Sequence, residues 1–328
     1  MSEQKLRWGL LSTAKINQAV IPPLRSSERN VLTAVASRSQ QSADAYAAEN
    51  QIERAFGSYE AMLADPDIDV VYNSLPNHLH AEWTIKAVEA GKHVLVEKPI
   101  ALSVAEVDAM AAAAQKHGRV VAEAFMYRHH PQTIQVVDML QSGKLGKVKL
   151  VRGAFGFNFS REDNYRLDPA RGGGAIWDVG CYPLSYTRAV LGAEPIEVFG
   201  WQVTGASGID ESFFAQLRFP GEIYAQFTCS FAMTFHATME MIGTEGRLNI
   251  PMPFKPGEEE HLLFTNTNNI TESIPVSGQP LYSGEVEDMA DAVLLGKAPR
   301  VSLADSRANV AAILALLESA QTGKPVTL

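Results

Sequence analysis

The chain has 328 residues, a hydrophobic fraction of 46%, a charged fraction of 20% and a formal net charge of −9. This composition is that of a globular protein long enough for two domains; the negative charge argues against general nucleic-acid binding, and no apolar run approaches the roughly 20 residues of a membrane helix. The first residues lack the apolar core of a secretory signal, and two cysteines are too few for a disulfide framework. We therefore expect a cytoplasmic protein with no nucleic-acid or membrane partner and, since no Cys/His cluster has zinc-site spacing, no metal.

Strand and helix signals alternate over residues 6–124. The predicted strands are Leu6–Leu11, Val31–Ala36, Val70–Ser74, His93–Val96 and Val120–Ala124, and the predicted helices are Ile16–Ser26, Ser42–Asn50, Ser58–Ala64, His78–Ala90 and Ser103–His117. We expect Pro22 and Pro23 to interrupt the first helix, and Ser103 and Glu106 to form a capping box on the last, which Gly118 ends. Such alternation predicts a doubly wound parallel (Rossmann) sheet with helices on both faces.

After about residue 130 strands dominate. Helices are predicted at Pro131–Gln141, Ala175–Leu191, Gly284–Leu295 and Ala304–Gln321, and strands at Val148–Phe159, Ile196–Thr204, Ser212–Phe219, Ile223–Phe231, Ala237–Ile242, Leu262–Thr265 and Ile270–Val276. Pro220-Gly221 predicts a hairpin turn. Runs of strands with separate helices indicate an α+β domain on a large, mostly antiparallel open sheet. We therefore predict two domains, residues 1–124 and 125–328.

The turn after the first strand is a candidate phosphate site. Dinucleotide binders use the spacing Gly-x-Gly-x-x-Gly/Ala there, which falls on Ser12, Ala14 and Asn17, so no glycine is present. Ser12 and Ala14 are nevertheless small, and hydroxyl donors are available. A turn of small residues is more often only a turn, but its place at the first strand favours a phosphate site. The candidate residues are Ser12, Thr13, Ala14, Lys15 and Ile16.

The end of the second strand bears on the cofactor. NAD binders place an Asp or Glu there to accept the ribose hydroxyls, whereas this chain has Ser37 and Arg38. Arg38 would hold a 2′-phosphate by charge-assisted hydrogen bonds or stack on the adenine; the alternative is a solvated loop arginine. The missing acid favours NADP, and NAD is less expected.

Two further motifs carry candidate chemistry. Glu97-Lys98-Pro99 follows a strand at the sheet edge where ligands bind, although a surface lysine is the commonest alternative. The run from Gly172 to Pro183 places three glycines before a helix, which lets the helix N-terminus approach another backbone or a ligand. Asp178 and Tyr182 are four residues apart and share one face if the segment is helical; Pro183 would kink it or start a new segment.

Taken together, these motifs resemble the glucose-fructose oxidoreductase / inositol dehydrogenase / rhizopine catabolism (Gfo/Idh/MocA) family over essentially the whole chain. The segments Leu11–Ile16 and Phe125–Arg128 are similar to the branch of dihydrodiol dehydrogenases and NADP-dependent aldose (D-xylose type) dehydrogenases. Tyr182 stands where many inositol-type members have histidine, which argues against inositol dehydrogenase.

The resemblance implies an NADP-dependent oxidoreductase that transfers a hydride between the nicotinamide and a CH–OH carbon of a sugar or diol. It implies Lys98 and Tyr182 as the catalytic pair, with Asp178 beside them to orient the substrate or the lysine. A free tyrosine has a pKa of about 10, and a neighbouring ammonium favours the phenolate that a general base requires. The first domain would bind NADP, and the second would bind substrate and form a homodimer or homotetramer through its sheet.

Other residues have less specific assignments. By the same resemblance Leu75, Pro76, Asn77, His80 and Glu97 line the cofactor, with a solvated helix position as an equal alternative for His80. Tyr127, Arg128, Tyr165, Arg166, Trp177 and Tyr282 are candidates for the substrate pocket, where packing is the alternative role. We expect Cys181 to be buried and inert.

Three alternative functions remain open from the sequence. One is a sugar oxidoreductase that retains its NADP and couples oxidation of one sugar to reduction of another. A second is a redox-assisted glycoside hydrolase, as some relatives are. A non-catalytic NADP or sugar sensor is disfavoured, because a sensor has no need of the Lys98/Tyr182 pair.

Overall fold

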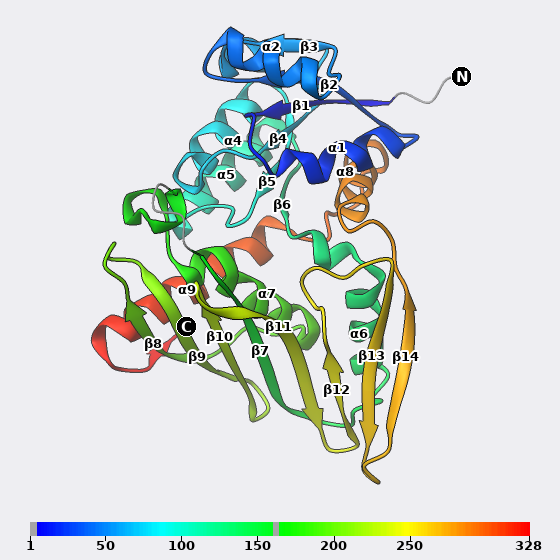
Figure 1. Ribbon diagram of the computed structural model, residues 1–328, viewed down its shortest axis with the longest axis vertical. Helices are drawn as coiled ribbons and strands as arrows, with labels where there is room; N and C mark the ends of the chain where they lie inside the picture. The colour runs from blue at the N-terminus through cyan, green and yellow to red at the C-terminus, as the bar shows by residue number, and fades with distance from the viewer. Residues whose placement is uncertain (1–4, 160–163) are drawn as a thin grey trace. The chain divides into compact units, whose positions relative to one another are not determined.

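The protein, a computed structural model that describes residues 5–159 and 164–328, divides into two compact units (Figure 1). Unit 1 comprises Met1–Met126 and Tyr282–Arg307, and unit 2 comprises Tyr127–Leu281 and Ala308–Leu328. These units differ from the predicted ranges, because a late segment of the chain returns to unit 1.

The returning segment contains helix α8 (Ser283–Leu295), which packs into the core of unit 1 with α1 (Asn17–Ser26). On its outer side Arg29 forms ion pairs with Glu287 (2.5 Å) and Asp291 (2.6 Å). These contacts join residues more than 250 positions apart in the sequence. A pattern of neighbouring residues contains no signal for contacts between such distant positions. The predicted domain division therefore did not assign the segment Tyr282–Arg307 to unit 1.

Unit 1 is built on a parallel six-stranded sheet of order β3-β2-β1-β4-β5-β6. Its strands are β1 (Leu6–Leu11), β2 (Asn30–Ala36), β3 (Arg54–Phe56), β4 (Val70–Asn73), β5 (His93–Glu97) and β6 (Val121–Ala124), and its other helices are α2 (Gln40–Glu49), α3 (Tyr59–Leu63), α4 (His80–Glu89) and α5 (Val104–His117). The predicted doubly wound sheet is confirmed. The strand order reverses between β1 and β4, and ligands bind beyond the carboxyl ends of the strands at such a point.

Most of the helix start and stop signals predicted for unit 1 are confirmed. Ser103 accepts the Glu106 amide (3.2 Å), the Glu106 carboxylate accepts the Leu102 amide (3.0 Å), and Gly118 ends α5 with φ 62°. The predicted interruption of the first helix is wrong, because α1 runs through Pro22 and Pro23 without a break. Its residues Val20, Ile21 and Leu24 are buried in the core, and this packing outweighs the amide donors that proline lacks.

Unit 2 is built on a nine-stranded sheet of order β14-β13-β12-β11-β7-β10-β9-β8-β15. Its strands are β7 (Val148–Asn158), β8 (Glu197–Thr204), β9 (Asp210–Phe219), β10 (Ile223–Ser230), β11 (Ala232–Gly243), β12 (Gly246–Ile250), β13 (Glu259–Asn266), β14 (Thr271–Ser277) and β15 (Val326–Thr327), with helices α6 (Pro131–Gln141), α7 (Cys181–Leu191) and α9 (Leu303–Thr322), the last shared with unit 1. The β7–β10 pair is parallel and the other recorded pairs are antiparallel, which confirms the predicted α+β architecture. The short strands β3, β12 and β15 were not predicted.

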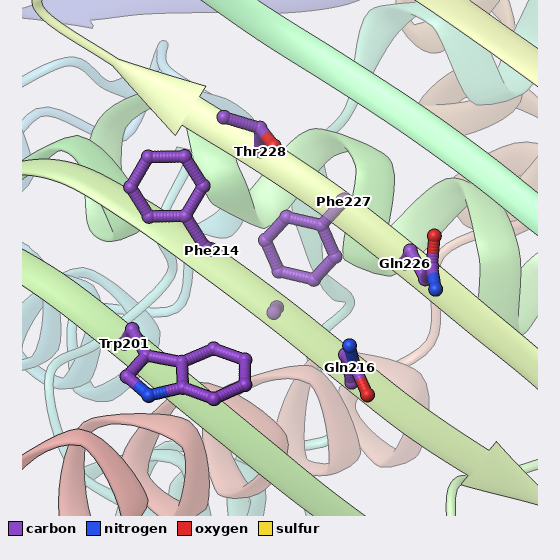
Figure 2. Close-up of a pocket in the computed structure, with 7 residues that line it drawn as sticks. Trp201, Phe214, Gln216, Gln226, Phe227 and Thr228 are labelled. Carbon is purple, nitrogen blue, oxygen red and sulfur yellow. The ribbon is translucent and has the colours of Figure 1, made fainter.

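The two faces of the unit 2 sheet differ in what covers them. A π-helical turn (η5, Ile176–Gly180) packs against β9 and β10, α7 packs against β7 and β10, and α9 lies behind β8, where Ser319 accepts the Gly200 amide (3.1 Å). Side chains alternate along each strand, so Trp201 and Phe214 point to the opposite, open face. Figure 2 shows these two rings on neighbouring strands, where they line a pocket together with Gln216.

Candidate active site

The loop after β1 is tied to the end of β4 by buried side chains. The Ser12 hydroxyl lies 2.8 Å from the Ser74 hydroxyl and accepts a hydrogen bond from the backbone amide of Ala14 (3.1 Å). The side-chain amide of Asn17 donates to the Ser12 carbonyl (2.8 Å) and accepts from the Ser74 hydroxyl (2.7 Å). Ser12 has φ 148°, a value that favours glycine and explains the usual glycine there. The Ser12 hydroxyl is thus engaged inside the protein, and sequence reasoning missed Ser74 and the role of Asn17.

The same loop leaves the start of α1 accessible. Thr13, Ala14 and Ile16 are half-buried, Lys15 is exposed, and the first turn of this ten-residue helix contains no acidic residue. The positive end of the helix dipole at such a position suits a pyrophosphate. The residues present therefore fit a dinucleotide, with the loop held in shape by Ser12, Ser74 and Asn17 in place of glycines.

At the end of β2, Ser37 and Arg38 have different surroundings. Ser37 is buried and donates its amide to the Phe56 carbonyl (2.9 Å). Arg38 is exposed and forms no hydrogen bond or ion pair with the described residues, although its charge acts on the Tyr59 phenol. Ser39 caps α2 by accepting the Ser42 amide (3.2 Å). Arg38 is therefore available for an anionic group, whereas Ser37 is mainly part of the strand end.

Lys98 follows β5 at the carboxyl edge of the sheet and is joined to Pro99 by a cis peptide bond. The segment after it is held by His80, whose Nδ1 lies 2.8 Å from the Pro99 carbonyl and whose Nε2 lies 2.6 Å from the Leu75 carbonyl. Complete burial outweighs these two carbonyl partners and lowers the pKa of His80 to about 4. The solvated alternative for His80 is therefore wrong: this ring links the segments that follow β4 and β5.

Among the remaining candidates of unit 1, Glu97 and Tyr282 lie in one cluster. Its carboxylate accepts the Tyr72 hydroxyl. Burial, together with the negative charges of Glu97 and Glu285, raises the pKa of Tyr282 above its usual range, so the Tyr282 phenol lies in this cluster. Glu285, which sequence reasoning missed, is 1% exposed. Leu75 and Asn77 are also buried, and Pro76 is half-buried.

In unit 2 the structure brings Asp178 and Arg166 together. The Arg166 Nε donates to an Asp178 carboxylate oxygen (2.8 Å), and the guanidinium lies 4.8 Å from the Tyr165 ring centroid. Burial disfavours the guanidinium charge, but Asp178, with smaller contributions from Tyr165 and Tyr182, raises the pKa of Arg166 above its usual value. Arg166 is thus within electrostatic range of both Asp178 and Tyr182, a pairing that the sequence did not reveal.

Tyr182 is enclosed by aromatic rings of unit 2. Its ring centroid lies 5.7 Å from that of Tyr127, 5.3 Å from Phe155 and 5.6 Å from Phe254. Tyr127 also donates its hydroxyl to the Tyr182 carbonyl (3.4 Å) and stacks on Tyr186. Arg128, half-buried, donates to Ser185 (3.1 Å). Tyr127 is fully buried, so it shapes the surroundings of Tyr182 by packing, and Phe155 and Phe254 had no sequence signal.

The helix that carries Asp178 and Tyr182 begins after the three glycines. Gly172 has φ 76°, and a Cβ at Gly173 would lie 2.5 Å from the Arg166 carbonyl oxygen, so the helix start approaches another backbone, as one reading of the motif predicted. The π-helical turn passes directly into α7 at Cys181 and α7 continues through Pro183, so Pro183 does not start a new segment. Trp177 and Cys181 are buried within this helical segment.

Among residues 5–159 and 164–328, no group of three or more His, Cys, Asp or Glu side chains is placed to hold a metal ion. Over the same ranges, no helix combines the length and the apolar composition that crossing a bilayer would require.

Comparison with known proteins agrees with this architecture. Residues 6–125 match the oxidoreductase family with an NAD-binding Rossmann fold (Gfo/Idh/MocA), and residues 133–249 match the Gfo/Idh/MocA C-terminal domain. A D-xylose 1-dehydrogenase (NADP⁺) of Haloferax volcanii is 37% identical and covers 98% of this chain and 100% of its own. A human trans-1,2-dihydrobenzene-1,2-diol dehydrogenase is 34% identical over 76% of this chain and 75% of its own.

Solved structures share the whole fold. An aldose-aldose oxidoreductase from Caulobacter crescentus, complexed with glycerol, superposes with a TM-score of 0.92 at 26% identity, covering 99% of this chain and 100% of its own. A 3-ketoreductase from Actinomadura kijaniata, in complex with NADP and TDP-benzene, has a TM-score of 0.91 at 29% identity, with coverages of 96% and 98%. The chain therefore belongs to the Gfo/Idh/MocA family of oxidoreductases and contains its NAD(P)-binding Rossmann domain.

Proposed function

We propose that the protein is an NADP-dependent dehydrogenase of the aldose 1-dehydrogenase or dihydrodiol dehydrogenase type, acting on a CH–OH carbon of a sugar or diol. One observation carries this proposal: the phenol of Tyr182 lies on the same helical segment as Asp178, which forms an ion pair with Arg166. The chain also has Lys98 at the carboxyl edge of a Rossmann sheet. The xylose and dihydrodiol dehydrogenases above, which are 37% and 34% identical, support the substrate class.

In this proposal Tyr182 is the general acid/base and the ammonium of Lys98 stabilises its phenolate. Hydride transfer at the nicotinamide is the chemistry that NADP supplies when bound. Tyr182 takes the hydroxyl proton in the oxidative direction and returns it to the carbonyl oxygen in the reverse direction. Asp178, held by Arg166 at 2.8 Å, orients the substrate, and the rings of Phe155 and Phe254 limit the access of water to the phenol.

A panel of aldoses, polyols and diols with NADP⁺, followed by the absorbance of the reduced nicotinamide, tests the proposal directly. We expect turnover with at least one aldose or diol. The absence of turnover across the panel in both directions would contradict it. Loss of a glycoside without net consumption of NADP would instead indicate the redox-assisted hydrolase.

One observation favours a second candidate function. The likeness to an aldose-aldose oxidoreductase spans nearly the whole chain, so this protein is also a candidate for an enzyme that retains NADP and couples two sugars. Purified protein would then carry the nucleotide and would interconvert two sugars without added NADP⁺. A freely exchanging dehydrogenase would lose the nucleotide on dialysis and would depend on added cofactor.

We expect Arg38→Ala to weaken NADPH binding strongly and NADH binding little. Arg38 is exposed without a partner among the described residues, which suits a 2′-phosphate, and a hydrogen bond to a charged group contributes about 1.5–3 kcal/mol, or roughly 10–150-fold in Kd. Titration of both nucleotides by fluorescence measures the two Kd values. Arg307→Ala removes another exposed arginine of unit 1, one paired with Asp108, and serves as the control. Equal losses for NADPH and NADH would refute the assignment.

We also propose that the protein forms homodimers or homotetramers through the open face of the unit 2 sheet. Large apolar side chains on β8, β9 and β10 are exposed there: Trp201 (54%), Val203 (54%), Phe214 (40%) and Tyr224 (52%). An exposed apolar surface of this extent marks an interaction site, and a twofold axis lets one such surface cover a second copy of itself.

The double variant Trp201→Glu/Phe214→Glu is expected to be monomeric, because burying two carboxylates opposite their own copies is unfavourable. Light scattering after size exclusion gives the mass. Ile270→Glu, at an exposed position in the turn between β13 and β14, is the matched control and should keep the wild-type mass. A monomeric wild type, or a double variant of unchanged mass, would count against this interface.

A further inference from the structure

We propose that Asp210 is a positioning residue for the reaction, because its carboxyl group caps the start of the helical segment that carries Asp178 and Tyr182. Asp210 is the first residue of β9, and its Oδ2 accepts the backbone amide of Ile176 at 2.7 Å. Ile176 is in turn the first residue of the π-helical turn. This inference rests on the proposed function, since it takes Tyr182 as the acid/base.

Gly174, which precedes this helix, lies directly against the Asp210 carboxyl group. Gly174 has φ 124°, and a Cβ built on it would lie 2.1 Å from Asp210 Oδ1. The carboxyl group therefore occupies the space that any other side chain at residue 174 would need. Nothing in the local sequence signals this contact, because Asp210 lies 34 residues beyond Ile176.

The partners of Asp210 are backbone amides. It is 5% exposed, and among the described residues no cationic side chain forms an ion pair with it. Burial raises the pKa of Asp210 to about 7, while the amides of Ile176 and Ala175 oppose that rise. The start of a helix has unpaired amides and a positive partial charge. A carboxyl group at this position accepts hydrogen bonds from the amides and interacts favourably with the partial charge.

The helix start is held from a second side by the backbone of Arg166. A Cβ at Gly173 would lie 2.5 Å from the Arg166 carbonyl oxygen, and the side chain of the same arginine binds Asp178 at 2.8 Å. Asp210 and Arg166 thus fix the beginning of the segment between them. Tyr182 follows six residues after Ile176 with no break in the helical structure, so a shift at the start is passed to the phenol.

The test is a series of variants at Asp210 assayed with the substrate found in the panel above. We expect Asp210→Ala to lower kcat about 10–100-fold with little change in the Kd of NADPH, since a displacement near 1 Å can cost about 10²-fold in rate. Asp210→Asn keeps an oxygen acceptor and is as good a cap as Asp, so it should restore most of kcat. Asp210→Ser, which keeps a hydroxyl on a shorter side chain, should lie between them.

Ser103→Ala is the matched control. It removes a capping side chain of the same kind from α5 in unit 1, and we expect it to lower Tm while kcat stays near wild type. If Asp210→Ala does not fold, the Ser and Asn variants give the same comparison. Equal kcat values for Ala, Ser, Asn and wild type would overturn the proposal, as would a loss of kcat in Ser103→Ala of the same size.

The two hypotheses fail in different ways. An inactive wild type, or a Tyr182→Phe variant with full activity, removes the proposed function whatever Asp210 does. An active wild type and an inactive Tyr182→Phe, combined with an Asp210→Ala variant of undiminished kcat, removes only the positioning role.

Discussion

Replacing Tyr182 by phenylalanine is expected to lower kcat by about 10²–10⁴-fold, the usual contribution of a positioned general acid/base. The ring remains to pack against Tyr127, Phe155 and Phe254, so the substitution removes the hydroxyl and little else. The Kd of NADPH should stay near its wild-type value. Single-turnover absorbance measures the chemical step, and fluorescence titration measures the nucleotide affinity.

Tyr186→Phe provides the matched control for this variant. Tyr186 lies one helical turn further along α7 and is fully buried. Removal of its hydroxyl should leave kcat near wild type. A Tyr182→Phe variant with unchanged kcat would exclude Tyr182 from the mechanism, and equal losses in the two variants would assign the effect to packing.

Replacing Lys98 by methionine should lower kcat/KM by about 10²-fold or more at neutral pH, a loss within the range of acid/base catalysis. Without the ammonium a phenol keeps its proton to higher pH, so the acid limb of the kcat/KM profile should move upward. The expected sign is therefore a larger deficit at pH 7 than at pH 9. Initial rates across this range, with saturating NADP⁺, measure the shift.

The control for Lys98 is Lys86→Met. Lys86 is an exposed lysine of unit 1 that pairs with Glu82 on α4, and its loss should leave both the rate and the pH profile intact. A Lys98→Met variant whose acid limb does not move would mean that the ammonium does not act on the general base. A Lys98→Arg variant that keeps the wild-type profile would show that charge alone suffices.

The local part of the fold was predictable from the chain. Strand and helix periods, the Ser103–Glu106 capping box and the stop at Gly118 depend on residues within a few positions of one another. The prediction that Pro22 and Pro23 interrupt the first helix was wrong because it used local sequence alone. The helix-breaking tendency of proline is also a local property, and burial of the neighbouring α1 residues in the core of unit 1 outweighs it.

The identities of the candidate site residues likewise came from short motifs. Glu97-Lys98-Pro99 at a strand end and the glycine-rich run before Asp178 and Tyr182 are each contiguous, and they led to the family that the comparisons show. The meeting of Lys98 and Tyr182 over one reactive carbon remains a prediction that the variants above address.

The sequence by itself therefore determined the order and type of most elements, the family and the identity of the proposed acid/base residues, because each depends on neighbouring positions. Only the tertiary structure decided which side chains support them: Ser74 and Asn17 on the Ser12 loop, His80 between the segments after β4 and β5, and Asp210 at the start of the Tyr182 helix. These contacts join elements distant along the chain. Their partners are largely backbone carbonyls, which every residue has, and backbone amides, which every residue except proline has, so no pattern of side chains predicts them.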